Sequence, residues 1–123
     1  MARTDRRVSY SPTGKVEDVT PEMAAVGAEA ALKILDGRWK MLILFHLFRA
    51  SVRRFSELEK AIPAISQKML AQQLRELERD SVVLRTVYAE VPPKVEYRLT
   101  DWGKALCPIL DQLLEWGAAK PNG

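Results

Sequence analysis

The segment SELEKAIPAISQKMLAQQLRELER, residues 56–79, predicts two helices separated by a tight turn. Ser56 can cap the first helix, and Glu59 three residues later completes a capping box. Pro63 then ends this helix, and Ser66 can cap a second, longer one. A short helix, a tight turn and a longer helix together form a helix-turn-helix unit.

One face of the second helix carries side chains suited to reading DNA bases. At 100° per residue, a narrow stripe holds Lys68, Gln72, Arg75 and Arg79. The opposite stripe holds Leu70, Leu74 and Leu77. Glutamine pairs with adenine in the major groove, and arginine or lysine pairs with guanine. The alternative is an ordinary amphipathic surface helix, which the flanking Glu76 and Glu78 favour.

A β-hairpin is expected after this helix. Residues 82–91 are rich in β-branched side chains, and residues 95–100 alternate between apolar and polar side chains. The two prolines at 92–93 require a longer tip than a two-residue turn. A hairpin in this position is the wing of a winged helix, and we expect Arg85 on its first strand and Lys94 at its tip to approach DNA.

Further candidate phosphate contacts lie at the edges of the helix-turn-helix. Arg53 and Arg54 precede it and could clamp the backbone, while Ser66 and Gln67 at the start of the second helix could hold a phosphate. For each cation the alternative is plain solvated surface charge. Residues 38–60 contain six basic and two acidic residues, 6 − 2 = +4, which favours nucleic acid as a partner.

Helices are predicted on both sides of this unit. Thr20 can cap a first helix that starts at Pro21, and Gly37 can take a positive φ after it. Residues 38–48 are apolar nearly all round, which is typical of a buried central helix. Thr100 can cap a last helix, kinked at Pro108.

These elements predict one α+β domain that is mainly α, and the composition is that of an ordinary soluble globular protein. We expect a mobile arm over residues 1–19, a domain over residues 20–118 and a tail over residues 119–123. A single cysteine excludes an intrachain disulfide and a cysteine-based zinc cage. The start lacks a secretory apolar core, and the longest apolar run is too short to cross a bilayer. We therefore expect a cytoplasmic protein with no metal, no cofactor and no membrane contact.

Several motifs together resemble one family. These are GRWK at 37–40, RFSEL at 54–58, IPAISQKML at 62–70, LRELE at 74–78 and VPPKVEY at 91–97. Over about residues 22–117 the chain resembles the HxlR family of bacterial winged helix-turn-helix transcription regulators. The resemblance implies dimeric DNA binding, with Ser66, Lys68, Gln72 and Arg75 on the recognition helix and Lys94 on the wing.

The resemblance also implies that the first and last helices form the dimer interface. The last helix independently carries an apolar stripe broader than one small domain can cover. The expected interface residues are Met23, Val26, Trp102, Leu106, Ile109, Leu110, Leu113, Leu114 and Trp116. Where many relatives have a cysteine, the chain has Val26-Gly27, and where they usually have glycine it has Ser81.

These observations predict a sequence-specific DNA-binding regulator of transcription that acts as a homodimer and is not an enzyme. Its partner would be a pseudo-palindromic double-stranded operator, and a small-molecule effector at the dimer seam is a further candidate partner. The alternative is a winged helix that binds proteins instead of DNA. Cys107 and His46 are expected to be core residues, since neither has a plausible partner for nucleophilic catalysis.

Overall fold

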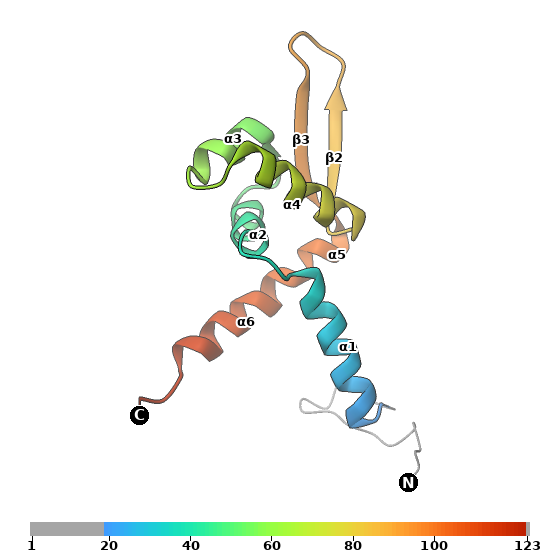
Figure 1. The fold of residues 1–123 in the computed structure, drawn as a ribbon, viewed down its shortest axis with the longest axis vertical. Coiled ribbons are helices and arrows are strands. Elements are labelled where there is room, and N and C mark those ends of the chain that lie inside the picture. Colours follow the sequence, from blue (N-terminus) through green and yellow to red (C-terminus); the bar gives the residue numbers. More distant parts are fainter. Residues whose placement is uncertain (1–18, 123) are drawn as a thin grey trace. The chain divides into compact units, whose positions relative to one another are not determined.

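The computed structural model describes residues 19–122, which divide into two units, one ending at Asp36 and the other beginning at Gly37 (Figure 1). Most of the predicted arm therefore lies outside the described residues, and a single domain over residues 20–118 stays a prediction. The first unit contains helix α1, Pro21–Ile34. The Oγ1 of Thr20 accepts a hydrogen bond of 3.1 Å from the Met23 backbone N–H, which confirms the predicted helix start.

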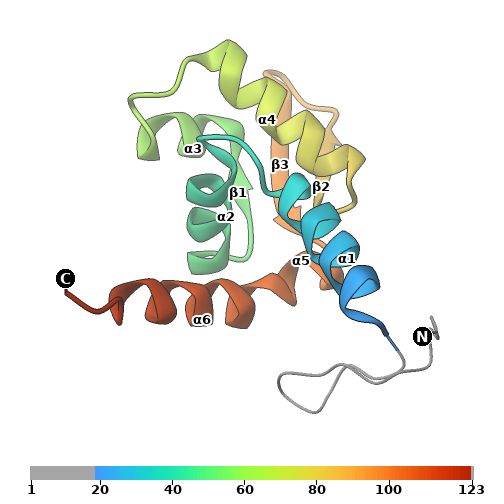
Figure 2. The same cartoon turned by 60° about the horizontal axis from the view of Figure 1, so that its bottom comes forward.

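The second unit is a winged helix. Its elements are α2 (Lys40–Arg49), β1 (Arg53–Arg54), α3 (Phe55–Ala61), α4 (Gln67–Arg79), β2 (Val83–Tyr88), β3 (Lys94–Leu99), α5 (Asp101–Lys104) and α6 (Leu106–Ala118). The strands form an antiparallel sheet in the order β1-β3-β2 (Figure 2). The β2–β3 hairpin projects beyond α3 and α4 (Figure 1). The predicted α+β, mainly α, winged helix-turn-helix is confirmed.

A leucine-rich core joins the helix-turn-helix to the sheet. The side chains with at most 2% exposure include Ile43, Leu44 and Leu47 of α2, and Leu70, Leu74 and Leu77 of α4. Val82 and Val83 extend this core to the start of the hairpin. The predicted central helix is present as α2, but it is buried on one side only, since Leu42 is 41% exposed. Helix α4 is fixed by the face opposite its basic stripe.

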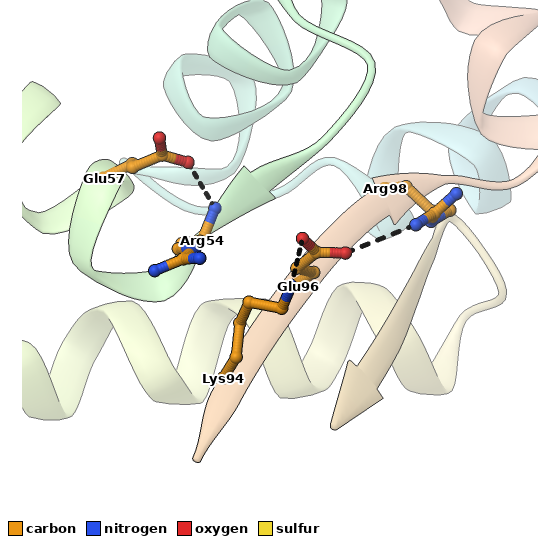
Figure 3. Close-up of polar contacts among 5 residues, drawn as sticks. All are labelled: Arg54, Glu57, Lys94, Glu96 and Arg98. Atoms are coloured by element: carbon orange, nitrogen blue, oxygen red, sulfur yellow. Dashed lines mark hydrogen bonds and ion pairs between the residues drawn. The ribbon is translucent and has the colours of Figure 1, made fainter. Parts of the chain in front are cut away.

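Helix α3 begins earlier than predicted. Its N-cap is Arg54, whose backbone N–H donates a 2.7 Å hydrogen bond to Oε1 of Glu57 (Figure 3). The predicted capping box of Ser56 and Glu59 is therefore wrong. The reason is tertiary: β1 pairs with β3, and the chain passes from this strand directly into the helix.

Both ends of α4 are closed by local hydrogen bonds. Ser66 caps its start as predicted, since its Oγ accepts a 3.0 Å hydrogen bond from the Met69 N–H. At its end Ser81 has φ +65°, and the Ser81 and Val82 N–H groups donate back into the last turn at 3.0 and 2.9 Å. This is a Schellman motif, in which the residue with positive φ is usually glycine.

The predicted last helix is interrupted, so that it forms α5 and α6 on either side of Ala105. Thr100 caps α5, because its Oγ1 accepts a 2.9 Å hydrogen bond from the Gly103 N–H. Pro108 has no N–H to donate to the carbonyl of Lys104, four residues earlier, so a break at this point replaces the predicted kink. Gly103 is packed so closely that a Cβ would overlap the Val82 carbonyl.

Candidate nucleic-acid interface

A groove of about 820 Å³ lies between α4, the start of α3 and the β2–β3 hairpin. Four cationic side chains and two acidic ones line it, and they are Arg54, Arg75, Arg85, Lys94, Glu78 and Glu90. The remaining lining is mostly small or apolar and includes Ala71, Val95 and Tyr97. A groove with a cationic excess and a nonpolar floor can hold the phosphate–sugar backbone of a nucleic acid.

The outward face of α4 borders this groove. All the α4 candidates are exposed, namely Gln67, Lys68, Gln72, Arg75 and Arg79, as is the capping Ser66. The leucines of the opposite stripe are fully buried. Because the core holds the helix by one face only, the polar stripe is presented to solvent along its length. The role of these side chains in reading bases stays a prediction.

Glu76 lies on α4 but is directed to an internal partner. Its Oε1 lies 2.6 Å from Nζ of Lys40, whose side chain is only 6% exposed. The hydrogen bond from Lys40, and then one from Gln72, hold the pKa of Glu76 below its usual value. Sequence reasoning treated Glu76 as a solvated flank residue and missed this pair. The available signal was a single lysine just before the apolar run 41–45, because a buried cation requires a counter-ion.

Lys94 occupies a different place from the one predicted. It is the first residue of β3, and residues 89–93 form the hairpin tip. Its Nζ lies 4.3 Å from the centroid of the Tyr88 ring and 3.8 Å from Oε2 of Glu96, and Oε1 of Glu96 accepts a 3.4 Å hydrogen bond from Arg98 (Figure 3). Lys94 is thus a braced cation at the base of the tip and not an exposed one at its end.

The two arginines before α3 have different surroundings. Arg54 is exposed and lines the groove, as a backbone clamp requires. Arg53 is half-buried, does not line the groove, and has its Nε enclosed without a hydrogen-bond partner among the described residues. Burial, and then the charges of Arg53 and Arg49, lower the pKa of His46. The expectation of a clamp therefore fits the position of Arg54 much better than that of Arg53.

Arg85 projects from the hairpin into the groove. It stands opposite Tyr97 in the β2–β3 register, so the two side chains share the face of the hairpin that lines the groove. Arg85 is exposed. The hairpin and α4 therefore each supply an arginine, Arg85 and Arg75, to the same groove.

Most of the predicted dimer residues are exposed, and they are divided between the two units of the chain. On α1 these are Met23 and Val26, and in the second unit they are Trp102, Ile109, Leu113, Leu114 and Trp116. Leu106 and Cys107 are half-buried. Leu110 is only 2% exposed, so it already belongs to the core of its own chain. Dimerisation through the exposed residues stays a prediction.

Residues 19–122 contain neither a metal-binding cluster nor a membrane-spanning helix. In that part of the chain, no cluster of three or more His, Cys, Asp or Glu side chains could hold a metal ion. No helix there is long and apolar enough to cross a membrane.

Comparison with known proteins gives consistent matches. Residues 34–122 match the model of the HxlR-like helix-turn-helix. Over 97 residues the chain is 53% identical to the HTH-type transcriptional regulator YtcD of Bacillus subtilis, covering 79% of this chain and 76% of YtcD. The YtcD crystal structure has a TM-score of 0.69 at 54% identity, covering 74% of this chain and 92% of that one. The structure of the redox regulator HypR in its reduced form has a TM-score of 0.70 at 45% identity. The match covers 76% of this chain and 91% of the HypR chain.

Proposed function

The chain belongs to the HxlR-like helix-turn-helix family, and on that premise we propose that it regulates transcription as a homodimer that binds a specific double-stranded operator. The observation that carries the proposal is the cationic groove between α4 and the hairpin, bordered by the exposed polar stripe of α4. The proposed action is binding without catalysis and without a cofactor, in the cytoplasm.

The two surfaces of the site have different tasks in this proposal. Arg54, Arg85 and Lys94 contact phosphates, which supplies affinity and makes binding sensitive to salt. Ser66 and Gln67 hold a further phosphate at the start of α4. Gln72 and Arg75 read base edges in the major groove, with Lys68 and Arg79 at the ends of the same stripe. In a twofold dimer the two copies of α4 would read half-sites about one helical turn of DNA apart.

The rival function is a winged helix that binds another protein. The charge of the groove favours DNA, because four cations against two carboxylates suit a polyanion. If the rival were correct, the chain would not bind DNA through the face formed by Lys68, Gln72 and Arg75.

The test measures binding of the full chain to DNA from upstream of its own gene and to a random duplex of equal length. Arg75→Ala should cost about 1–3 kcal/mol on the preferred DNA and far less on the random duplex. Lys94→Ala should weaken binding to both by a similar factor, since a phosphate contact carries no sequence information. Lys104→Ala, which removes a cation from α5 outside the groove, is the matched control.

Two results would count against the proposal. If the wild-type chain bound both DNAs equally, its binding would not be sequence-specific. If Arg75→Ala weakened binding to both DNAs equally, Arg75 would not read bases, and α4 would be a nonspecific DNA-binding surface.

A further inference from the structure

Lys40, Glu76 and Gln72 form a chain of polar contacts from beneath α4 to its exposed face. The Nζ of Lys40 lies 2.6 Å from Oε1 of Glu76. The other oxygen of that carboxylate, Oε2, accepts a 3.4 Å hydrogen bond from Nε2 of Gln72. We propose that Lys40 is a positioning residue for DNA recognition, which holds Glu76 so that Glu76 orients the side-chain amide of Gln72 toward the bases. This inference rests on the proposed function, because it concerns the bases that α4 would read.

The pair is fixed because Lys40 is buried. Its side chain is 6% exposed, whereas that of Glu76 is 25% exposed. An ammonium group in that position requires a counter-ion, and breaking such a pair from one side is strongly unfavourable. Glu76 is therefore held toward α2 instead of moving freely over the DNA-facing surface. The hydrogen bonds from Lys40 and Gln72 both lower the pKa of Glu76, so the carboxylate is ionised at neutral pH.

An ionised Glu76 selects one of the two orientations of the Gln72 amide. The Nε2 group has two N–H donors, and one of them faces the carboxylate. The flipped amide would place its oxygen against the carboxylate, which is repulsive. The selected orientation leaves one N–H and the oxygen Oε1 available to DNA. Adenine presents the matching pair in the major groove, an acceptor at N7 and a donor at N6.

The same pair counters the charge of Glu76, which also lies within electrostatic range of Arg79. Glu76 is one helical turn from Arg79, at the spacing where opposite charges on a helix attract. Without Lys40, the carboxylate could pair with Arg79 and would repel the DNA phosphates. With Lys40 beneath α4, the negative charge of Glu76 is balanced by an ammonium group inside the protein. Lys40 therefore contributes to recognition without touching DNA.

The test selects preferred sequences from duplexes with a randomised central segment, using the full chain. Gln72→Ala identifies the base pair that Gln72 reads. Lys40→Met keeps the bulk of the side chain and removes its charge, and we expect it to lower the preference at that base pair by about three- to tenfold. The base pair that Arg75→Ala identifies should keep its preference. Lys40→Arg, which restores a cation, should recover most of the lost preference.

The matched control is Lys104→Met, an identical substitution on α5 outside the groove, which should leave every preference unchanged. Three outcomes would overturn the inference: Gln72→Ala alters no preference, Lys40→Met leaves the Gln72 base pair unchanged, or Lys40→Met weakens all positions alike, as a purely structural residue would. If the wild-type chain selected no sequence, the proposed function itself would be wrong. This result can be distinguished from the other three because it appears without any substitution.

A second measurement does not depend on whether Lys40→Met folds. In the free wild-type protein, the NMR signals of the Gln72 side-chain amide, assigned by their loss in Gln72→Ala, should move as Glu76 is protonated. The midpoint should lie below the ordinary glutamate pKa of 4.5, because Lys40, Gln72 and Arg79 all stabilise the carboxylate. Amide signals that follow no such titration would contradict the proposed contact.

Discussion

Helices α4 and α6 are both 13 residues long, yet they present opposite surfaces to solvent. α4 buries Leu70, Gln73, Leu74 and Leu77 and exposes a polar and basic stripe. α6 buries Leu110 alone and exposes a largely apolar face. An exposed basic stripe suits a polyanion, while an exposed apolar stripe suits another protein surface. In the proposed function, this difference would assign α4 to DNA and α6 to assembly.

The position of each helix in the fold explains this difference. α4 packs against α2 and the hairpin, so its leucines are buried in the core of the chain. α6 follows the break at Ala105, and Leu110 is the residue through which it enters that core. Four of its other large side chains remain exposed, up to 77% for Trp116, and these are Ile109, Leu113, Leu114 and Trp116. We expect a second copy of the chain to cover them.

The largest effect should come from placing charge on the apolar face of α6. Leu114→Glu together with Trp116→Glu should leave the fold intact, because both residues are exposed in the chain. The variant should be monomeric in sedimentation equilibrium. Its affinity for a two-half-site operator should fall on the order of 100-fold, since the second half-site then binds independently.

The control for this variant is Gln112→Glu, which adds charge at an exposed polar position of the same helix. It should leave both assembly and DNA affinity unchanged. If the double variant stayed dimeric with wild-type affinity, α6 would not be the assembly surface, and its contrast with α4 would have no functional meaning.

The next effect separates buried leucines from exposed ones. In the monomeric double variant, Leu74→Ala should lower the free energy of unfolding by about 2–5 kcal/mol, because it opens a cavity under α4. Leu113→Ala on α6 should cost less than about 1 kcal/mol in that background, because Leu113 is 43% exposed whereas Leu74 is fully buried. Urea denaturation measures both, and equal losses would show that α6 is part of the core.

Sequence reasoning found the elements whose signals are local. Ser66 caps α4 because its hydroxyl oxygen needs only an N–H three residues ahead, and Thr20 and Thr100 follow the same rule. The two faces of α4 followed from its helical periodicity. The HxlR-like resemblance stated from five motifs is also confirmed.

Most of the failures come from tertiary contacts: two join residues distant in sequence, and one joins the neighbouring strands of the hairpin. The start of α3 depends on pairing of Arg53 and Arg54 with β3, some forty residues later, which no local pattern shows. The partner of Lys40 is Glu76, on another helix. Lys94 is braced by Tyr88 from the opposite strand. Each of these corrections changes the description of the candidate site more than that of the fold.

A smaller effect concerns the end of α4. Ser81 has φ +65°, where a side chain is disfavoured, and it occupies the C′ position of a Schellman motif. Ser81→Gly should raise the free energy of unfolding by up to about 1 kcal/mol, because glycine adopts positive φ without a Cβ penalty. Ser51→Gly, at an exposed bend without positive φ, should give no gain. Urea denaturation of the two variants distinguishes relief of backbone strain from a general effect of glycine.

The smallest expected effect concerns the start of α6. We expect a mild thiol oxidant to leave operator affinity unchanged, although the similar HypR is a redox regulator by name. Cys107 is the single cysteine of the chain, so no intrachain disulfide can form. It is half-buried in the first turn of α6, and a bond between two copies would require Cα atoms about 4.4–6.8 Å apart across the dimer axis. On α1, Val26 and Gly27 supply no thiol.

The measurement is a titration of operator binding with and without oxidant, on the wild-type chain and on Cys107→Ser. Equal curves in all four cases would assign α6 to assembly alone, with any signal arriving as a non-covalent ligand. A loss of affinity in the oxidised wild type that disappears in Cys107→Ser would make Cys107 the sensor. In that case α6 would transmit a signal to α4 as well as hold the two copies together, because a covalent change at its first turn would have altered binding at the distant groove.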